Sequence, residues 1–125
     1  YLPADIKALD IVEVDKNFNI IKEPKLKEYV YLFSFGQKNH PFCASMIASF
    51  QGHLNIELMK EGAQLFQGKR NFKQYCTKPS KDTIFEREIL VSKIEENNLY
   101  TANFFPDKSY AFHIHSKGFM RYQIR

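Results

Sequence analysis

The sequence lacks several features that would assign it to common functional classes. No window of 18 apolar residues is present, so we expect no transmembrane helix, and the first residues carry no signal-peptide apolar region. There is no internal repeat, P-loop, dinucleotide-binding glycine motif or Ser-His-Asp arrangement. The 2 cysteines, Cys43 and Cys76, form no C-x-x-C pair. We therefore expect reduced thiols and a cytoplasmic protein.

What the sequence does contain is typical of one globular domain spanning residues 1–125. Its apolar content is 44% and its aromatic content 15%, which argues against disorder. The formal net charge of +4 is compatible with a polyanionic partner but does not require one. The chain has no initiator methionine, which we interpret as a sign of a fragment or a processed start.

The apolar pattern predicts an α+β fold, an antiparallel β-sheet with helices packed on it. Residues 54–67 have an apolar stripe at helical spacing, with Asn55 as the N-cap and Gly68 placed to end the helix. Residues 42–50 are ambiguous between a short helix and an irregular segment, and residues 71–75 suggest a single further turn. Runs rich in aromatic and β-branched residues predict five strands, at residues 7–14, 28–35, 84–94, 99–105 and 110–115.

The end of the chain carries the most specific motif. A strand-like run is followed by Lys117-Gly118-Phe119-Met120, and Arg125 closes the sequence after what reads as the start of a helix. This order resembles the G-F-[LM]-x-x-x-[VI]-R signature of the tRNA pseudouridine synthase A family. In that family the final arginine pairs with the catalytic aspartate.

Three further segments resemble motifs of the same family, in the same order. Residues 18–31 are similar to a Phe-His-Ala-Arg segment followed by [KR]-x-Tyr-x-Tyr, although Asn19 replaces the usual histidine. Residues 59–72 resemble M-x-x-A-A-x-x-[LF]-x-G-x-H-D-F, with Arg70 and Asn71 where the family has His and Asp. Arg87-Glu-Ile corresponds to the family's R-x-I. The four motifs together cover nearly the whole chain.

The resemblance implies an enzyme that converts uridine to pseudouridine in the anticodon stem-loop of tRNA, works as a homodimer and needs no cofactor. It assigns catalytic roles to Tyr29, which would stack on the uracil and assist proton removal at C5, and to Arg125, which would hold the catalytic carboxylate ionised. The other candidate substrate-binding residues are aromatic supports and phosphate contacts: Phe119, Phe72, Lys27, Lys69, Arg70, Lys73 and Arg121. Judged from the sequence alone, Phe72 and Phe119 are more typical of a core.

The family's G-R-T-D-x-G-V-H loop, which holds the nucleophilic aspartate, has no counterpart here, and neither does its closing C-terminal segment. We therefore expect this chain to be the central-to-C-terminal part of a catalytic region, inactive by itself. A non-catalytic RNA-binding module with the same fold is the alternative, and a small α+β interaction domain is a third interpretation. His113 and His115 share one strand face, but the sequence shows no third ligand, so we predict no metal site.

Overall fold

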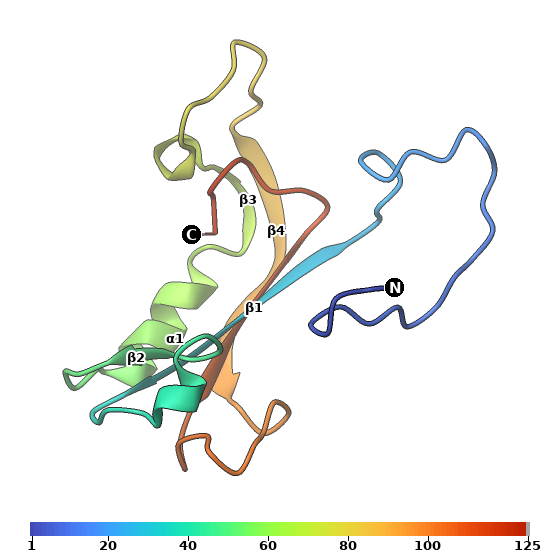
Figure 1. Ribbon diagram of the computed structural model, residues 1–125. Coiled ribbons are helices and arrows are strands. Elements are labelled where there is room, and N and C mark those ends of the chain that lie inside the picture. Colours follow the sequence, from blue (N-terminus) through green and yellow to red (C-terminus); the bar gives the residue numbers. More distant parts are fainter. Residues whose placement is uncertain (125) are drawn as a thin grey trace.

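The protein is organised around a five-stranded sheet, seen in the computed structural model, which describes residues 1–124 (Figure 1). The strand order is β2-β1-β5-β4-β3. All neighbouring strands are antiparallel except β1 and β2, so the sheet is mixed. The strands are β1 (Lys27–Phe35), β2 (Ala48–Phe50), β3 (Gly68–Asn71), β4 (Glu86–Glu96) and β5 (Tyr110–Ser116). The helical elements are η1 (Pro41–Cys43), α1 (Ile56–Gln64) and η2 (Lys73–Tyr75). The predicted α+β class is confirmed.

The centre of the sheet joins its first strand in the sequence to its last. Strand β5 lies between β1 and β4, and its register places Ile114 opposite Tyr29 on one side and opposite Ser92 on the other. A register shift between Ile89 and Val91 marks a bulge in β4. Because the bulge adds a residue, Ile89 and Ser92 can both point to the face that Ile114 occupies.

Helix α1 forms where the sequence predicts a helix, although it is shorter than residues 54–67. The Asn55 side chain accepts a hydrogen bond from the Leu58 backbone N–H at 3.1 Å, which confirms the predicted N-cap. The helix ends at Gln64, and Gly68 follows as the first residue of β3 with φ of +95°. A glycine suits this junction because other residues rarely adopt a positive φ.

The two faces of the sheet differ in what covers them. The helix face carries α1, η2 and the C-terminal segment 117–124 (Figure 1). The Ser92 hydroxyl ties α1 to this face by donating a hydrogen bond of 2.6 Å to the carbonyl of Ala63. Since side chains alternate along a strand, the odd-numbered residues of β1 point to the helix face and the even-numbered ones to the other. We name the second face the histidine face, because His113 and His115 lie on it.

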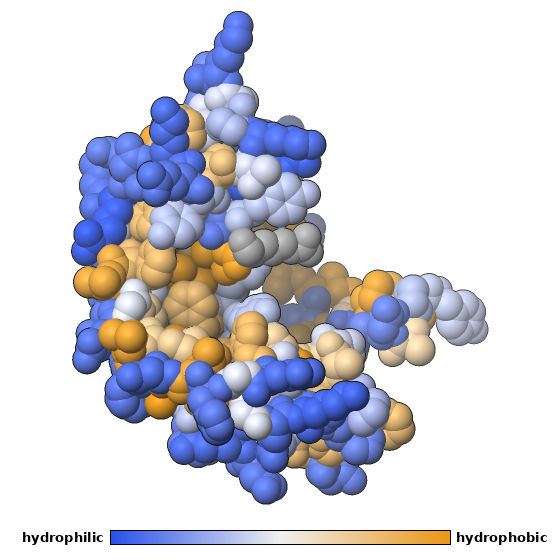
Figure 2. Space-filling model, turned by 90° about the vertical axis from the view of Figure 1, so that its left-hand side faces the viewer, coloured by the Kyte–Doolittle hydropathy of each residue, from blue (hydrophilic) through white to orange (hydrophobic). Residues whose placement is uncertain are grey.

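The core lies on the helix face. Its buried members are Phe72, Ile89, Ile114 and Met120. Partly buried aromatic residues, including Phe66 and Phe119, pack around them. Figure 2 views this side of the molecule and shows apolar side chains gathered in the middle, with hydrophilic ones above and below.

The prediction of a strand at residues 7–14 is wrong. Residues 1–26 contain only turns and irregular backbone, and nearly all of their side chains are exposed, including Leu9 and Ile11. Figure 1 shows this segment running outside the sheet. An alternating apolar pattern forms a strand only where a neighbouring strand satisfies its backbone groups, and no described strand pairs with this segment.

The strand predicted at residues 99–105 is also absent. Its backbone forms turns, with Asn97 accepting from the Tyr100 N–H at 3.0 Å and capping the bend through its side chain. Residues 42–50 resolve into η1 and β2, and the single turn predicted at residues 71–75 is η2. The helix expected to begin after Gly118 does not form within the described residues, where residues 121–124 make a turn.

The only α-helix of residues 1–124 has 9 residues, too few to cross a lipid bilayer. Both cysteines are free thiols. Cys43 is buried and donates a hydrogen bond to the Phe104 carbonyl at 2.8 Å, so it acts as a packing residue of the η1 loop.

Candidate active site

The candidate catalytic tyrosine lies on the helix face, next to the C-terminal motif. Tyr29 is the third residue of β1, and its ring meets that of Phe119 edge to face with the centroids 5.3 Å apart. Tyr29 keeps 52% of its surface exposed. One edge of the phenol is therefore fixed by an aromatic contact, while the rest is open to a partner such as a nucleobase.

The four sequence motifs meet at this place. The segment 18–31 supplies Tyr29, the segment 59–72 supplies Phe72, and Arg87-Glu-Ile supplies Ile89, which belongs to the same core cluster as Phe72. The terminal motif supplies Phe119 and Met120, which complete the same cluster. Residues that lie far apart in the sequence thus assemble one continuous patch.

The two aromatic residues predicted to bind substrate have different surroundings in the structure. Phe72 is only 3% exposed and stacks near Phe66 and Tyr75, with centroid distances of 6.5 and 6.0 Å. It is a core residue that shapes the patch from below. Phe119 is partly buried and touches Tyr29, so it is the aromatic residue in a position to support a ligand. Arg125, the other residue predicted to be catalytic, lies outside the described residues.

The basic candidates do not all face the same way. Arg70 and Arg87 are opposite each other in the β3–β4 pair, in line with Gly68 and Ile89, and therefore on the helix face. Lys69 points to the opposite face, where its ammonium group lies 3.2 Å from the carboxylate of Glu86. Two guanidinium groups directly across a strand pair repel each other, so this position favours an anion between or above them.

A cationic hollow of about 470 Å³ lies beside this arginine pair. Arg87, Arg121 and Lys78 line it, together with one carboxylate, Asp82. The Nε atom of Arg87 is buried and has no hydrogen-bond partner among the described residues. The motif position of Arg87 was visible in the sequence, but its pairing with Arg70 was not, because that depends on the register of β3.

The other predicted contacts are more dispersed. Lys27 begins β1 opposite Ser116, at the margin of the helix face. Lys73 holds its ammonium group 5.7 Å from the centre of the Phe85 ring, and Arg121 places its guanidinium 5.3 Å from the centre of the Tyr122 ring. Of the basic residues predicted to bind substrate, Arg70 belongs to the arginine pair and Arg121 lines the hollow, and the others lie elsewhere.

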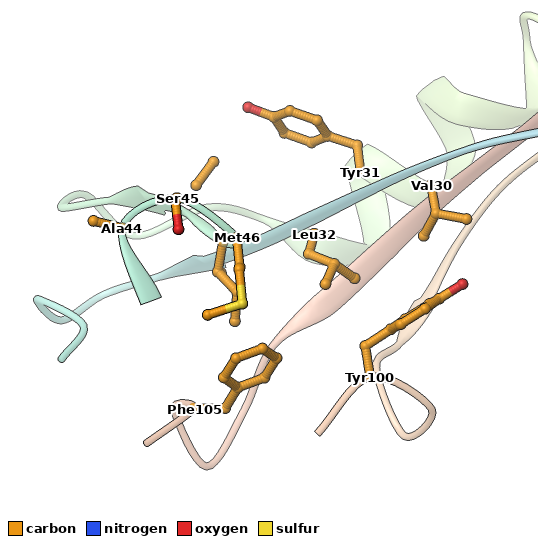
Figure 3. Close-up of a pocket in the computed structure, with 10 residues that line it drawn as sticks. Val30, Tyr31, Leu32, Ala44, Ser45, Met46, Tyr100 and Phe105 are labelled. Carbon is orange, nitrogen blue, oxygen red and sulfur yellow. The ribbon is translucent and has the colours of Figure 1, made fainter. Parts of the chain in front are cut away.

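A cavity larger than this hollow lies away from the candidate site. Its volume is about 610 Å³, and Val30, Leu32, Met46, Tyr100 and Phe105 line it. Figure 3 shows Val30 and Leu32 pointing into it from β1, with Tyr31 on the other side of the strand. The lining is mostly apolar, its only side-chain polar groups besides sulfur are the hydroxyls of Tyr31, Ser45 and Tyr100, and it contains no carboxylate or cation, so this cavity offers no charged group suited to phosphate.

A second polar group, which sequence analysis did not assemble, occupies the histidine face. The Oε1 atom of Glu28 lies 3.2 Å from His113 Nδ1 and 3.0 Å from His115 Nε2. The hydrogen bond with His113 and then the contact with His115 keep the pKa of the Glu28 carboxyl below its ordinary value. The sequence revealed the two histidines but not Glu28, because only the β1–β5 register brings it opposite His115.

Comparison with known proteins gives several relatives with one function. The chain is 28% identical to tRNA pseudouridine synthase A of Syntrophomonas wolfei over 124 residues, which cover 99% of this chain and 46% of that protein. It is 27% identical to the enzyme of the same name from Moorella thermoacetica, over 99% of this chain and 47% of that protein. The corresponding protein of Pseudothermotoga lettingae is 36% identical over 74 residues, 59% of this chain and 30% of that protein. No family model matches.

The chain, whose α+β sheet carries Tyr29, Phe119 and an arginine pair on one face, is thus similar in sequence to RNA pseudouridine synthases. The relatives are specifically tRNA pseudouridine synthase A, so the resemblance predicted from the four motifs is confirmed. The chain spans about half the length of the curated relatives that it matches along nearly its whole length.

Proposed function

We propose that this chain is the central-to-C-terminal part of the catalytic region of a tRNA pseudouridine synthase. The enzyme would isomerise uridine to pseudouridine in the anticodon stem-loop. The observation that carries the proposal is the meeting of all four family motifs around Tyr29 and Phe119 on the helix face.

The proposed chemistry breaks the N-glycosidic bond, turns the free uracil and rejoins it to the sugar through C5. The target nucleotide has to leave the base stack to be reached. Tyr29 is in a position to receive it, because the exposed part of its ring can stack on uracil while Phe119 holds the other edge. The phenol would then help to remove the C5 proton. Arg125 would keep the nucleophilic carboxylate ionised and aimed.

The RNA backbone would run across the arginine pair. Arg70 and Arg87 face the same side as Tyr29, and Arg121 continues the cationic surface into the hollow. Guanidinium groups suit phosphates because they can donate two hydrogen bonds at once. A homodimer that grips one tRNA and works in the cytoplasm belongs to the same proposal, by resemblance to the family.

The 125 residues by themselves would not turn over, because they contain no G-R-T-D segment to supply the nucleophile. The test measures tritium release from tRNA labelled at C5 of uridine, using this chain and the protein as encoded, with any residues beyond it. We expect release only from a protein that carries such an aspartate. Turnover by the 125-residue chain would contradict the assignment of roles.

Tyr29 provides the sharper test within an active protein. Tyr29→Phe keeps the ring contact with Phe119 and removes the hydroxyl, so kcat should fall by about 10²–10⁴-fold while RNA affinity changes little. Tyr31→Phe is the matched control, since Tyr31 lies on the same face of the same strand and is 50% exposed. Equal losses in both variants would refute the catalytic role of Tyr29.

A further inference from the structure

The cluster of Glu28, His113 and His115 has the composition of a metal site. Two imidazoles and one carboxylate are the donors that zinc uses in sites with three protein ligands. Their three donor atoms lie within 4.8 Å of one another. The two histidines are separated by one residue on β5, and Glu28 is directly opposite His115 on β1, so regular strand pairing alone brings the set together.

Both distances from the Glu28 oxygen to the imidazole nitrogens match the donor spacing of a zinc site. In a tetrahedral zinc site with bonds of roughly 2.0–2.1 Å, neighbouring donor atoms are about 3.3 Å apart. The Glu28 oxygen is 3.2 Å from His113 Nδ1 and 3.0 Å from His115 Nε2. A small outward movement of the Glu28 side chain, which is 47% exposed, would admit the ion.

The bonding of His115 points the same way. Its Nε2 atom is buried and makes no hydrogen bond with correct geometry to any described residue, although the Glu28 oxygen is close. A buried polar atom without a partner costs free energy, and a metal ion facing its lone pair would remove that cost. The histidine side chains are 17% and 21% exposed, which shelters the site but leaves it reachable.

The surrounding charges also permit a cation. The one ammonium group opposite His113 on β4 belongs to Lys93, and it is engaged by the Glu95 carboxylate at 2.8 Å. Neutral imidazoles with one carboxylate give the three ligands a charge of −1, which a divalent ion balances to +1. No described residue supplies a fourth protein ligand, so water would complete the tetrahedron.

We propose that Glu28, His113 and His115 bind a zinc ion that joins β1 to β5. This site is independent of the proposed activity, because it lies on the histidine face and Tyr29 points to the other. Its effect would be structural: the ion would fix the strand that carries Tyr29 against the strand that leads to Phe119.

Zinc chloride titrated by calorimetry into the chelator-treated 125-residue chain tests the site. We expect one ion per chain. His115→Ala should weaken binding by at least about 100-fold, because loss of a ligand exceeds the roughly 10–100-fold effect of losing an outer partner. Glu28→Gln, which keeps the shape of the side chain, should weaken it about tenfold or more. His53→Ala is the matched control, since His53 is exposed and belongs to neither strand.

Thermal unfolding gives a second readout. Excess zinc should raise the Tm of the unaltered chain and of His53→Ala by the same amount and that of Glu28→Gln by less, because a ligand stabilises the folded state in proportion to the logarithm of its concentration over its Kd. The proposal is overturned if the unaltered chain binds no zinc, or if His115→Ala and Glu28→Gln bind it as tightly. It is also overturned if Cys76→Ser, not the histidine variant, abolishes binding.

Discussion

Arg70 and Lys69 are adjacent in the sequence but point to opposite faces of β3, which makes them a test of where RNA binds. Arg70 lies on the helix face opposite Arg87, whereas Lys69 is engaged by Glu86 on the other face. Both Arg70→Gln and Lys69→Gln remove one positive charge. If RNA crosses the helix face, only the Arg70 change removes a phosphate contact.

The size of the effect follows from counterion release. One phosphate contact contributes about 0.9 to the slope of log K against log salt concentration. At roughly 0.1 M salt the same contact is therefore worth about eightfold in affinity, or about 1.2 kcal/mol. Arg70→Gln should lower the salt slope by about 0.9 and the affinity by about eightfold. Lys69→Gln should change neither the slope nor the affinity.

The assay is fluorescence anisotropy with a labelled anticodon stem-loop RNA, over roughly 50–200 mM salt. Folding is checked in parallel, and Arg70→Gln should change stability little, because it relieves the repulsion between two facing guanidinium groups while removing only an exposed hydrogen bond from Arg70 Nε to the Gln67 carbonyl. Equal changes in slope for Arg70→Gln and Lys69→Gln would refute the placement of RNA on the helix face. So would salt-insensitive binding by the unaltered chain.

Two further predictions concern the packing that supports the site. Phe72→Ala should lower the free energy of unfolding by about 3–5 kcal/mol, because it empties a buried aromatic position; Phe42→Ala, at a side chain that is 69% exposed, should cost far less in the same urea titration. Ser92→Ala should cost about 1–2 kcal/mol, the lower part of the range for a lost buried hydrogen bond, because the Ala63 carbonyl keeps a second donor in the Phe66 N–H. The control Ser49→Ala breaks an exposed bond of 3.3 Å, and an equal loss there would contradict this account.

The elements that the sequence predicted well are those whose signals are local. Helix α1 follows from a 3.6-residue apolar stripe and the Asn55 cap, and both are properties of neighbouring residues. Strand β5 and most of β1 and β4 follow from dense β-branched and aromatic residues. The aromatic part of the candidate site was predictable because each motif is short and the motifs occur in the family's order.

The sequence did not predict which strands pair with each other or in which register. Residues 7–14 alternate as a strand should, yet they have no neighbour in the described sheet, and a strand without one is not stable. The same limit hid the contact of Glu28 with the histidines and the facing arginines Arg70 and Arg87. Each of these depends on which residue of one strand stands opposite which residue of another, and a one-residue slip would change it.

The position of β5 has a consequence for how the chain is made. Glu28 and His113 touch although 85 residues separate them, and β4 can join β1 only through the strand between them. The middle of the sheet therefore stays open until the ribosome has released Ser116, and until then the edge of β1 away from β2 has no partner strand. Closing so long a loop is entropically costly and slows folding. During synthesis, this open edge of β1 is a surface that a chaperone would protect.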